Sequence, residues 1–137
     1  MTKLTLATLA LTFAAGTAFA AGHAVPMVDA VDQDVSNGVV SASNIVAGEN
    51  GWLVVHRTDG EMKPGPVVGY APIRAGETSD VAAILQEPVA SGEMLMLMVH
   101  SEAGGMETGI FEYTLGAQED GPIRVGESLV MTVITAQ

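Results

Sequence analysis

The chain has 137 residues and no cysteine, and its 16 acidic residues outnumber 5 basic ones. The formal net charge of −11 repels phosphate backbones and anionic membrane surfaces, so we expect neither nucleic acid nor membrane as a partner. Without disulfides the stability must come from a hydrophobic core, for which one domain of this length suffices. Scattered carboxylates keep such a surface solvated, and they leave cationic partners and metal ions as candidates.

The first twenty residues have the features of a secretory signal peptide. Lys3 precedes an apolar stretch over residues 4–19, and Ala18-Phe19-Ala20 supplies a small-x-small cleavage site. A membrane anchor is the alternative, but the stretch is short for a spanning helix. We predict a signal-peptide helix over residues 1–20, cleavage after Ala20, and one mature domain over residues 21–137 that is periplasmic or secreted. Loss of Lys3 alone changes the net charge from −11 to −12.

Short β-type segments alternate with turn signals through the mature region. The dipeptides Asn37-Gly38 and Asn50-Gly51 suit turns that need positive φ, and no amphipathic helix of three turns, repeat or linker interrupts the pattern. This predicts an all-β fold, an antiparallel β-sandwich of immunoglobulin-like or cupredoxin-like type with seven to eight strands. The expected strands are 28–35, 39–46, 52–57, 67–70, 80–86, 94–101, 110–115 and 128–135.

Two of these segments reveal their faces by alternation. In residues 52–57, one face combines Trp52 with His56, and in residues 94–101 one face combines three methionines with His100. Both faces of each segment are largely apolar. We therefore predict two central strands covered on both sides, with Trp52 in the core.

Histidine and methionine side chains raise the possibility of a copper site. Imidazole and thioether are ligands that suit copper in oxidising compartments, and the thioether selects the cuprous ion. A site formed by His56, His100 and Met98 is predicted if the two strand ends meet. The competing interpretation is that the alternating methionines fill the core and that each histidine is a hydrogen-bonded structural residue. Copper is therefore the candidate cofactor, and no other is indicated.

The strand order decides whether these histidines meet. If the segments 67–70 and 80–86 both cross the sandwich, His56 and His100 lie at its opposite ends, or poles. If residues 67–70 form only a short edge strand, the two histidines share a pole. The prolines that flank residues 67–70 favour an edge or partial strand, so we expect a shared pole.

A second copper site is independent of the fold. Cleavage after Ala20 leaves Ala21-Gly22-His23 at the new terminus. The free amine, two backbone nitrogens and the His23 imidazole can surround a square-planar copper(II) or nickel(II) ion. A chance histidine at this position is the alternative.

The common catalytic motifs are absent from the sequence. It contains no Gly-x-Ser-x-Gly, no His-Glu-x-x-His and no phosphate-binding glycine-rich loop. We expect a non-enzymatic exported binding or surface module of unknown ligand, with the turns at 59–65 and 102–109 presenting contacts. A periplasmic copper-binding or copper-delivery protein is the alternative.

Five short motifs occur in the predicted strands and turns. They are Gly51-Trp52-Leu53-Val54-Val55-His56, Gly65-Pro66-Val67-Val68-Gly69, Leu97-Met98-Val99-His100-Ser101-Glu102, Phe111-Glu112 and Asp120-Gly121-Pro122. With these motifs the chain resembles an uncharacterised domain family found in secreted and surface proteins of halophilic archaea and of several bacterial groups. The resemblance covers residues 39–136 and implies an exported β-sandwich with an acidic surface, with no established activity. Family members often carry aspartate where this chain has Glu102.

Overall fold

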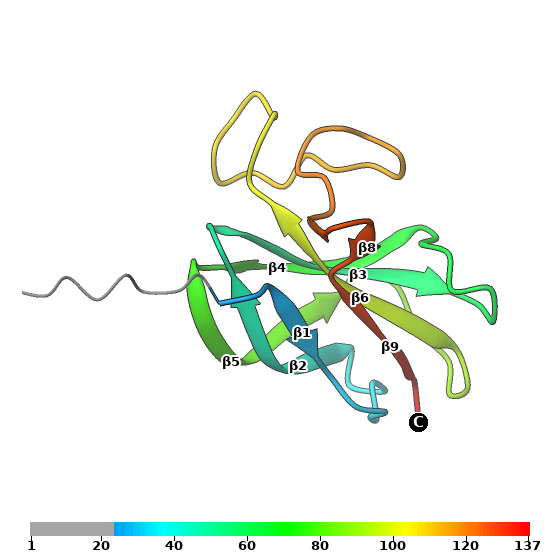
Figure 1. Ribbon diagram of the computed structural model, residues 1–137. Coiled ribbons are helices and arrows are strands. Elements are labelled where there is room, and N and C mark those ends of the chain that lie inside the picture. The colour runs from blue at the N-terminus through cyan, green and yellow to red at the C-terminus, as the bar shows by residue number, and fades with distance from the viewer. Residues whose placement is uncertain (1–23) are drawn as a thin grey trace, which may run out of the picture.

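The computed structural model describes residues 24–137, which form an all-β domain (Figure 1). The predicted signal-peptide helix, the cleavage site and His23 lie outside the described residues. Among residues 24–137, no helix reaches the length and hydropathy that a membrane span requires. The strands are β1 (Met27–Asp29), β2 (Val39–Ala47), β3 (Gly51–Thr58), β4 (Val67–Ile73), β5 (Gly76–Leu85), β6 (Met94–Ser101), β7 (Arg124–Val125), β8 (Ser128–Leu129) and β9 (Met131–Thr135).

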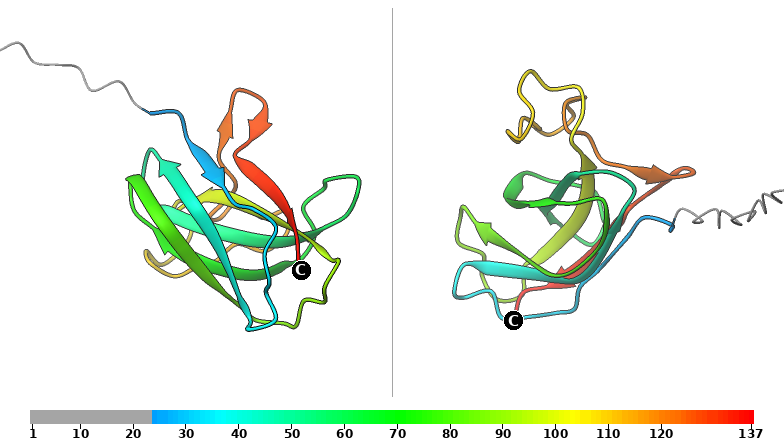
Figure 2. Two further views of the ribbon diagram at one scale, coloured as in Figure 1. Left: turned by 90° about the horizontal axis from the view of Figure 1, so that it is seen from below. Right: turned by 90° about the vertical axis from the view of Figure 1, so that its left-hand side faces the viewer.

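Seven strands form one antiparallel sheet in the order β1-β2-β5-β4-β3-β6-β9, and β7 and β8 form a separate hairpin. The sheet curls until its two edges approach each other (Figure 2), where Gln33 and Ala136 form a parallel bridge. Opposite parts of the sheet therefore pack face to face around one core. This confirms the predicted all-β antiparallel sandwich.

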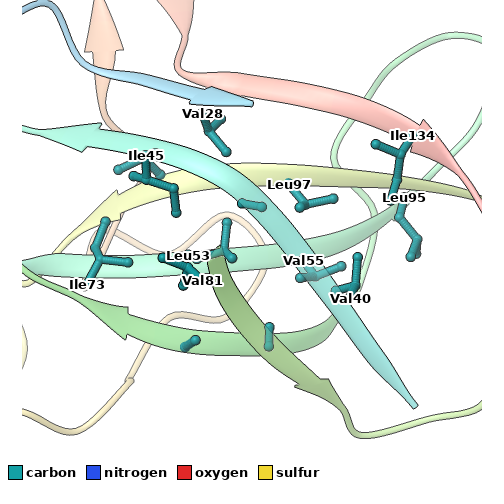
Figure 3. Packing of buried hydrophobic residues seen from close by; sticks show 14 of the residues in the cluster. Val28, Val40, Ile45, Leu53, Val55, Ile73, Val81, Leu95, Leu97 and Ile134 are labelled. Carbon is teal, nitrogen blue, oxygen red and sulfur yellow. The ribbon is translucent and has the colours of Figure 1, made fainter. Parts of the chain in front are cut away.

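The concave face of the sheet holds the main hydrophobic core (Figure 3). Leu53 and Val55 of β3 and Leu95 and Leu97 of β6 are fully buried in it. Because alternate residues of a strand point to opposite faces, these four side chains share one face of the β3–β6 pair. Full burial of such a side chain contributes about 1.5–3 kcal/mol to stability.

The opposite face of β3 and β6 is buried as well. Trp52, His56, Met96, Met98 and His100 are each at most 6% exposed on that face. The prediction that these two strands are central and covered on both sides is therefore confirmed, as is the core position of Trp52.

Three sequence-based expectations are wrong. The segment 67–70 is neither an edge nor partial, because β4 extends to Ile73 and lies between β5 and β3. Its Pro72 is tolerated beyond Gly69 and Tyr70, the stretch that pairs with β5. The expected strand at 110–115 is irregular chain that packs through aromatic rings rather than through a backbone ladder. The expected strand at 28–35 shortens to β1, followed by a bridge at Gln33.

The two asparagine-glycine dipeptides serve different purposes. Gly38 has φ 77°, as the predicted turn requires. Gly51 is instead the first residue of β3, where a Cβ atom would lie 2.1 Å from the carbonyl oxygen of His100. Glycine is needed there because the β6 backbone approaches closely.

Gly51→Ala should lower the free energy of unfolding by about 1–3 kcal/mol, because the methyl group must displace the β6 backbone. Gly48→Ala is the matched control, since a Cβ atom there has no neighbour within 4 Å. Urea unfolding of both variants measures the difference. Equal stability of the two would contradict the close approach at Gly51.

Candidate functional site: a covered histidine pair

His56 and His100 meet on the outer face of the β3–β6 pair. Their Nε2 atoms are 3.4 Å apart and their ring centroids 5.5 Å apart. The two residues are 0% and 1% exposed, so the pair is sealed from solvent.

The strand register explains how the two rings meet. His56 is paired with Met96, and His100 with Trp52, so the histidines stand four residues apart along the ladder. That separation is roughly 13 Å along the strands, which two imidazole side chains span by leaning towards each other. The intervening pair on the same face is Val54 and Met98. Met98 therefore lies between the two histidines on the face from which their rings project.

Backbone carbonyl groups fix the orientation of both rings. Nδ1 of His56 lies 2.8 Å from the carbonyl oxygen of Gly65, and Nδ1 of His100 lies 2.6 Å from that of Asp120. A carbonyl oxygen only accepts hydrogen bonds, so each Nδ1 carries the proton and donates it. In the neutral rings, each Nε2 atom therefore directs a lone pair towards the other ring.

Burial keeps these rings neutral near pH 7. It lowers the pKa of His100 to about 4, against the opposing effects of the hydrogen bond to Asp120 and of the Asp120 carboxylate. Burial also lowers the pKa of His56, and the hydrogen bond to Gly65 opposes this shift in part. The two unprotonated Nε2 atoms therefore face each other with no hydrogen-bond donor between them. Both could bind a metal ion.

A single irregular segment covers the pair. We name residues 102–122 the cover loop; its yellow and orange ribbons stand off the sheet at the top of Figure 1. Tyr113 presents a ring edge-to-face to both histidines, with centroids 5.8 Å from His56 and 4.6 Å from His100. Phe111 packs on Trp52 at 5.4 Å and on Tyr70 at 4.3 Å. These aromatic contacts exclude water from the imidazoles.

Two carboxylates secure the ends of the cover loop. Glu102 accepts a 2.7 Å hydrogen bond from Nε1 of Trp52 and a 3.0 Å bond from the Gly109 amide. Asp120, 1% exposed and in the left-handed region at φ 45°, accepts bonds from the amides of Ala103 and Glu112. Hydrogen bonds to a carboxylate are about twice as strong as neutral ones, so these residues hold the cover loop in place.

The donor set of the site is two imidazoles and a thioether. No group of three or more His, Cys, Asp or Glu side chains that could hold a metal ion occurs within residues 24–137. At a metal–nitrogen bond length of about 2.0 Å, an Nε2–Nε2 separation of 3.4 Å corresponds to a ligand–metal–ligand angle of roughly 115°. That angle is bent rather than linear, which leaves a position for a third ligand. Met98 is the methionine that the register places between the two histidines.

The structure brings His56 and His100 together, with Met98 between them in the strand register, but not in the predicted way. Two strands, β4 and β5, separate β3 from β6 along the chain, so the two histidines lie towards opposite ends of the ladder and not at a shared pole. They meet because β3 and β6 are direct neighbours and the rings share a face. His23, the fourth predicted metal ligand, lies outside the described residues.

Sequence reasoning missed the residues that orient and cover the pair. Tyr113 falls in a segment expected to be a strand, and Gly65 and Asp120 act through backbone carbonyl groups, which any residue carries. A signal was nevertheless present, because the motifs quoted for the family resemblance converge here. Gly51, Trp52, His56, Gly65, His100, Glu102, Phe111 and Asp120 all contact the pair or the residues that enclose it.

Fold and site together define a small all-β domain with a histidine pair enclosed between a sheet and a cover loop. The chain belongs to the family described as a domain of unknown function, DUF7282, whose model matches residues 26–137. The match includes every strand and the whole cover loop. No curated protein and no solved structure matches the chain significantly.

The metal-free protein should lose stability as the pH falls from 7 to 5. A depressed histidine pKa means that the unfolded chain takes up a proton near its ordinary value of 6.5, whereas folded His100 does so only near 4. The expected loss at pH 5 is about 2 kcal/mol from His100, and His56 adds to it in the same direction. Urea unfolding at both pH values measures the loss.

His100→Gln should remove most of this pH dependence and serves as the control. Asp34 and Glu93 have lowered pKa values and lose their contributions only below the ordinary values of 3.8 and 4.5, outside this range. Wild-type stability that stays constant between pH 7 and 5 would contradict the burial of neutral imidazoles.

Proposed function

We propose that this domain is a non-enzymatic exported module that binds one copper(I) ion between His56 and His100, with Met98 as the third ligand. The observation that carries the proposal is the pair of facing Nε2 atoms, each on a ring whose Nδ1–H is bonded to a backbone carbonyl. Histidines that bind metal almost always donate the other ring N–H to such a partner, which fixes the tautomer and the ring orientation.

Without a metal ion, each protonation state of the histidine pair is unfavourable in this buried site. If both rings are neutral with Nδ1 protonated, two lone pairs face each other at 3.4 Å. Reversing one tautomer supplies an Nε2–H donor but directs an Nδ1 lone pair at a carbonyl oxygen. A proton shared between the rings would remove both conflicts, but burial lowers the pKa of both histidines. A cation with affinity for neutral imidazole resolves the arrangement at neutral pH.

The donor set favours copper(I) over zinc. Zinc in proteins is almost always four-coordinate and takes nitrogen, thiolate or carboxylate ligands, whereas a thioether selects cuprous copper. The nearest buried carboxylate, Asp120, has both oxygens occupied by backbone amides. Two imidazoles and one thioether at a bent angle therefore suit a three-coordinate cuprous ion.

Titration with copper(I) against a competing chelator should show one equivalent bound, followed through the fluorescence of Trp52, the chain's single tryptophan and the cross-strand partner of His100. His56→Gln or His100→Gln should each weaken binding by more than roughly 100-fold, since they remove a ligand rather than its supporting partner. Met98→Leu should weaken binding roughly tenfold while costing less than about 1.5 kcal/mol of stability, because the volume is conserved.

Met94→Leu is the matched control for the thioether, because Met94 lies beyond His56 along the ladder, opposite Thr58. It should leave copper affinity unchanged. Wild-type binding no tighter than that of His56→Gln/His100→Gln would sink the proposal. So would nitrogen NMR shifts showing an Nε2–H in the metal-free protein at pH 7, because the proton would then be the occupant.

Export is proposed from the sequence of residues 1–20 and places the module in the periplasm or outside the cell. The mature protein recovered from cells should begin at Ala21, as read by intact mass spectrometry. That terminus would also create the copper(II) site at His23, which His23→Ala should abolish without changing copper(I) binding. A retained leader, or a start displaced by one residue, would contradict both the cleavage site and the terminal copper site.

A further inference from the structure

The hydrogen bonds in the middle of the cover loop are internal to the loop. Within the described chain, every hydrogen bond made by residues 103–119 ends within residues 102–120. The two Asp120 carboxylate bonds, the Glu102 bond to the Gly109 amide and the turns at Ile110 and Ala117 all belong to this set. This pattern is that of an Ω-loop, a compact surface segment held by its own contacts.

Attachment of the cover loop to the sheet takes two forms. Its ends are bonded to the sheet, where Trp52 donates to Glu102, His100 donates to the Asp120 carbonyl oxygen and the Ser101 amide donates to Gly121. Between these ends, the rings of Phe111 and Tyr113 pack on the sheet. Lifting residues 102–120 would therefore break the bonds from Trp52 and His100 and the ring contacts beneath the loop, and none of the bonds within it.

The loop also lies where access to the site is needed. His56 and His100 are at most 1% exposed, and the opposite face of their strands is the main core, so an ion cannot reach them through the sheet. The outer side of the loop exposes apolar side chains, with Met106 96%, Ile110 51% and Leu115 56% exposed. Met106, almost fully exposed, contributes no packing to closure.

We infer that residues 102–120 form a lid that opens as one unit, hinged next to Ser101 and Gly121, and controls entry of the ion to the histidine pair. The gating of copper rests on the proposed function, whereas the opening motion does not. Closure depends on the packing of Phe111 against Trp52 and Tyr70 and of Tyr113 against the imidazoles. Segments held by few contacts to the core open more readily than the sheet that carries them.

Hydrogen exchange followed by NMR on the metal-free protein tests the opening without copper. The Trp52 Nε1–H lies under the lid and is bonded to Glu102 at its end, so it should exchange at least tenfold faster than the amides of β3 and β6. The Ala103 and Glu112 amides are bonded to Asp120 within the loop and should stay protected while the lid is open.

Two outcomes of this experiment would overturn the inference. If the Trp52 Nε1–H exchanges only as fast as the sheet amides, the cover does not open separately. If the Ala103 and Glu112 amides exchange as fast as the Trp52 Nε1–H, the loop melts instead of moving as a unit.

Copper transfer tests the gating. Phe111→Ala should raise the rates of copper(I) uptake and of release to a chelator by at least tenfold each, with a much smaller change in affinity, because Phe111 is not a ligand. Met106→Ala, at a side chain of the same loop that is 96% exposed, should change neither rate. Unchanged rates in Phe111→Ala would refute the gate. Absence of copper binding in the wild type would refute the proposed function alone, because the exchange experiment still decides whether the lid opens.

Discussion

The antiparallel pairing of β3 with β6, with Val54 opposite Met98, is the constraint on which the rest of the structure depends. Side chains alternate between the faces of a strand, so this register directs Leu53, Val55, Leu95 and Leu97 into the main core. The same register directs both histidines to the other face. A slip of one residue in either strand would exchange its two faces, placing an imidazole in the core and a leucine or valine under the cover loop.

A central strand pair that is apolar on both faces requires two covers. The curled sheet supplies the first, and the cover loop supplies the second with no ladder of its own across the site. Rings from the loop fill the space above the ladder, and the carboxylates of Glu102 and Asp120 accept hydrogen bonds from backbone amides of the loop and from the indole of Trp52. Acidic residues in this chain are thus structural at these two positions and not only a solvated surface.

Period-2 alternation predicts the faces of β3 and β6 correctly, because burial on both sides leaves a clear trace in residue type. It does not predict the meeting of His56 with His100, because that depends on which strands are neighbours and on a diagonal reach across four residues. The prediction that both histidines share one pole of the sandwich fails for the same reason. Residues 110–115 look like a strand because Phe111 and Tyr113 alternate, yet their rings serve packing on the sheet. The part played by the carbonyl groups of Gly65 and Asp120 could not be predicted, because every residue carries a backbone carbonyl group.

Two facing lone pairs on buried imidazoles lower the stability of the whole domain. Each buried Nε2 without a donor costs about 1–3 kcal/mol relative to a satisfied group. The facing lone pairs therefore reduce the stability of a small domain that has no disulfide to compensate. The proposed ion would return that free energy and add its own binding free energy to stability, provided that it binds only the folded state. Hydrogen bonds to Gly65 and Asp120 already fix the orientation of the two rings. The rings would therefore lose little orientational freedom when the proposed ion binds, because they are ordered during folding.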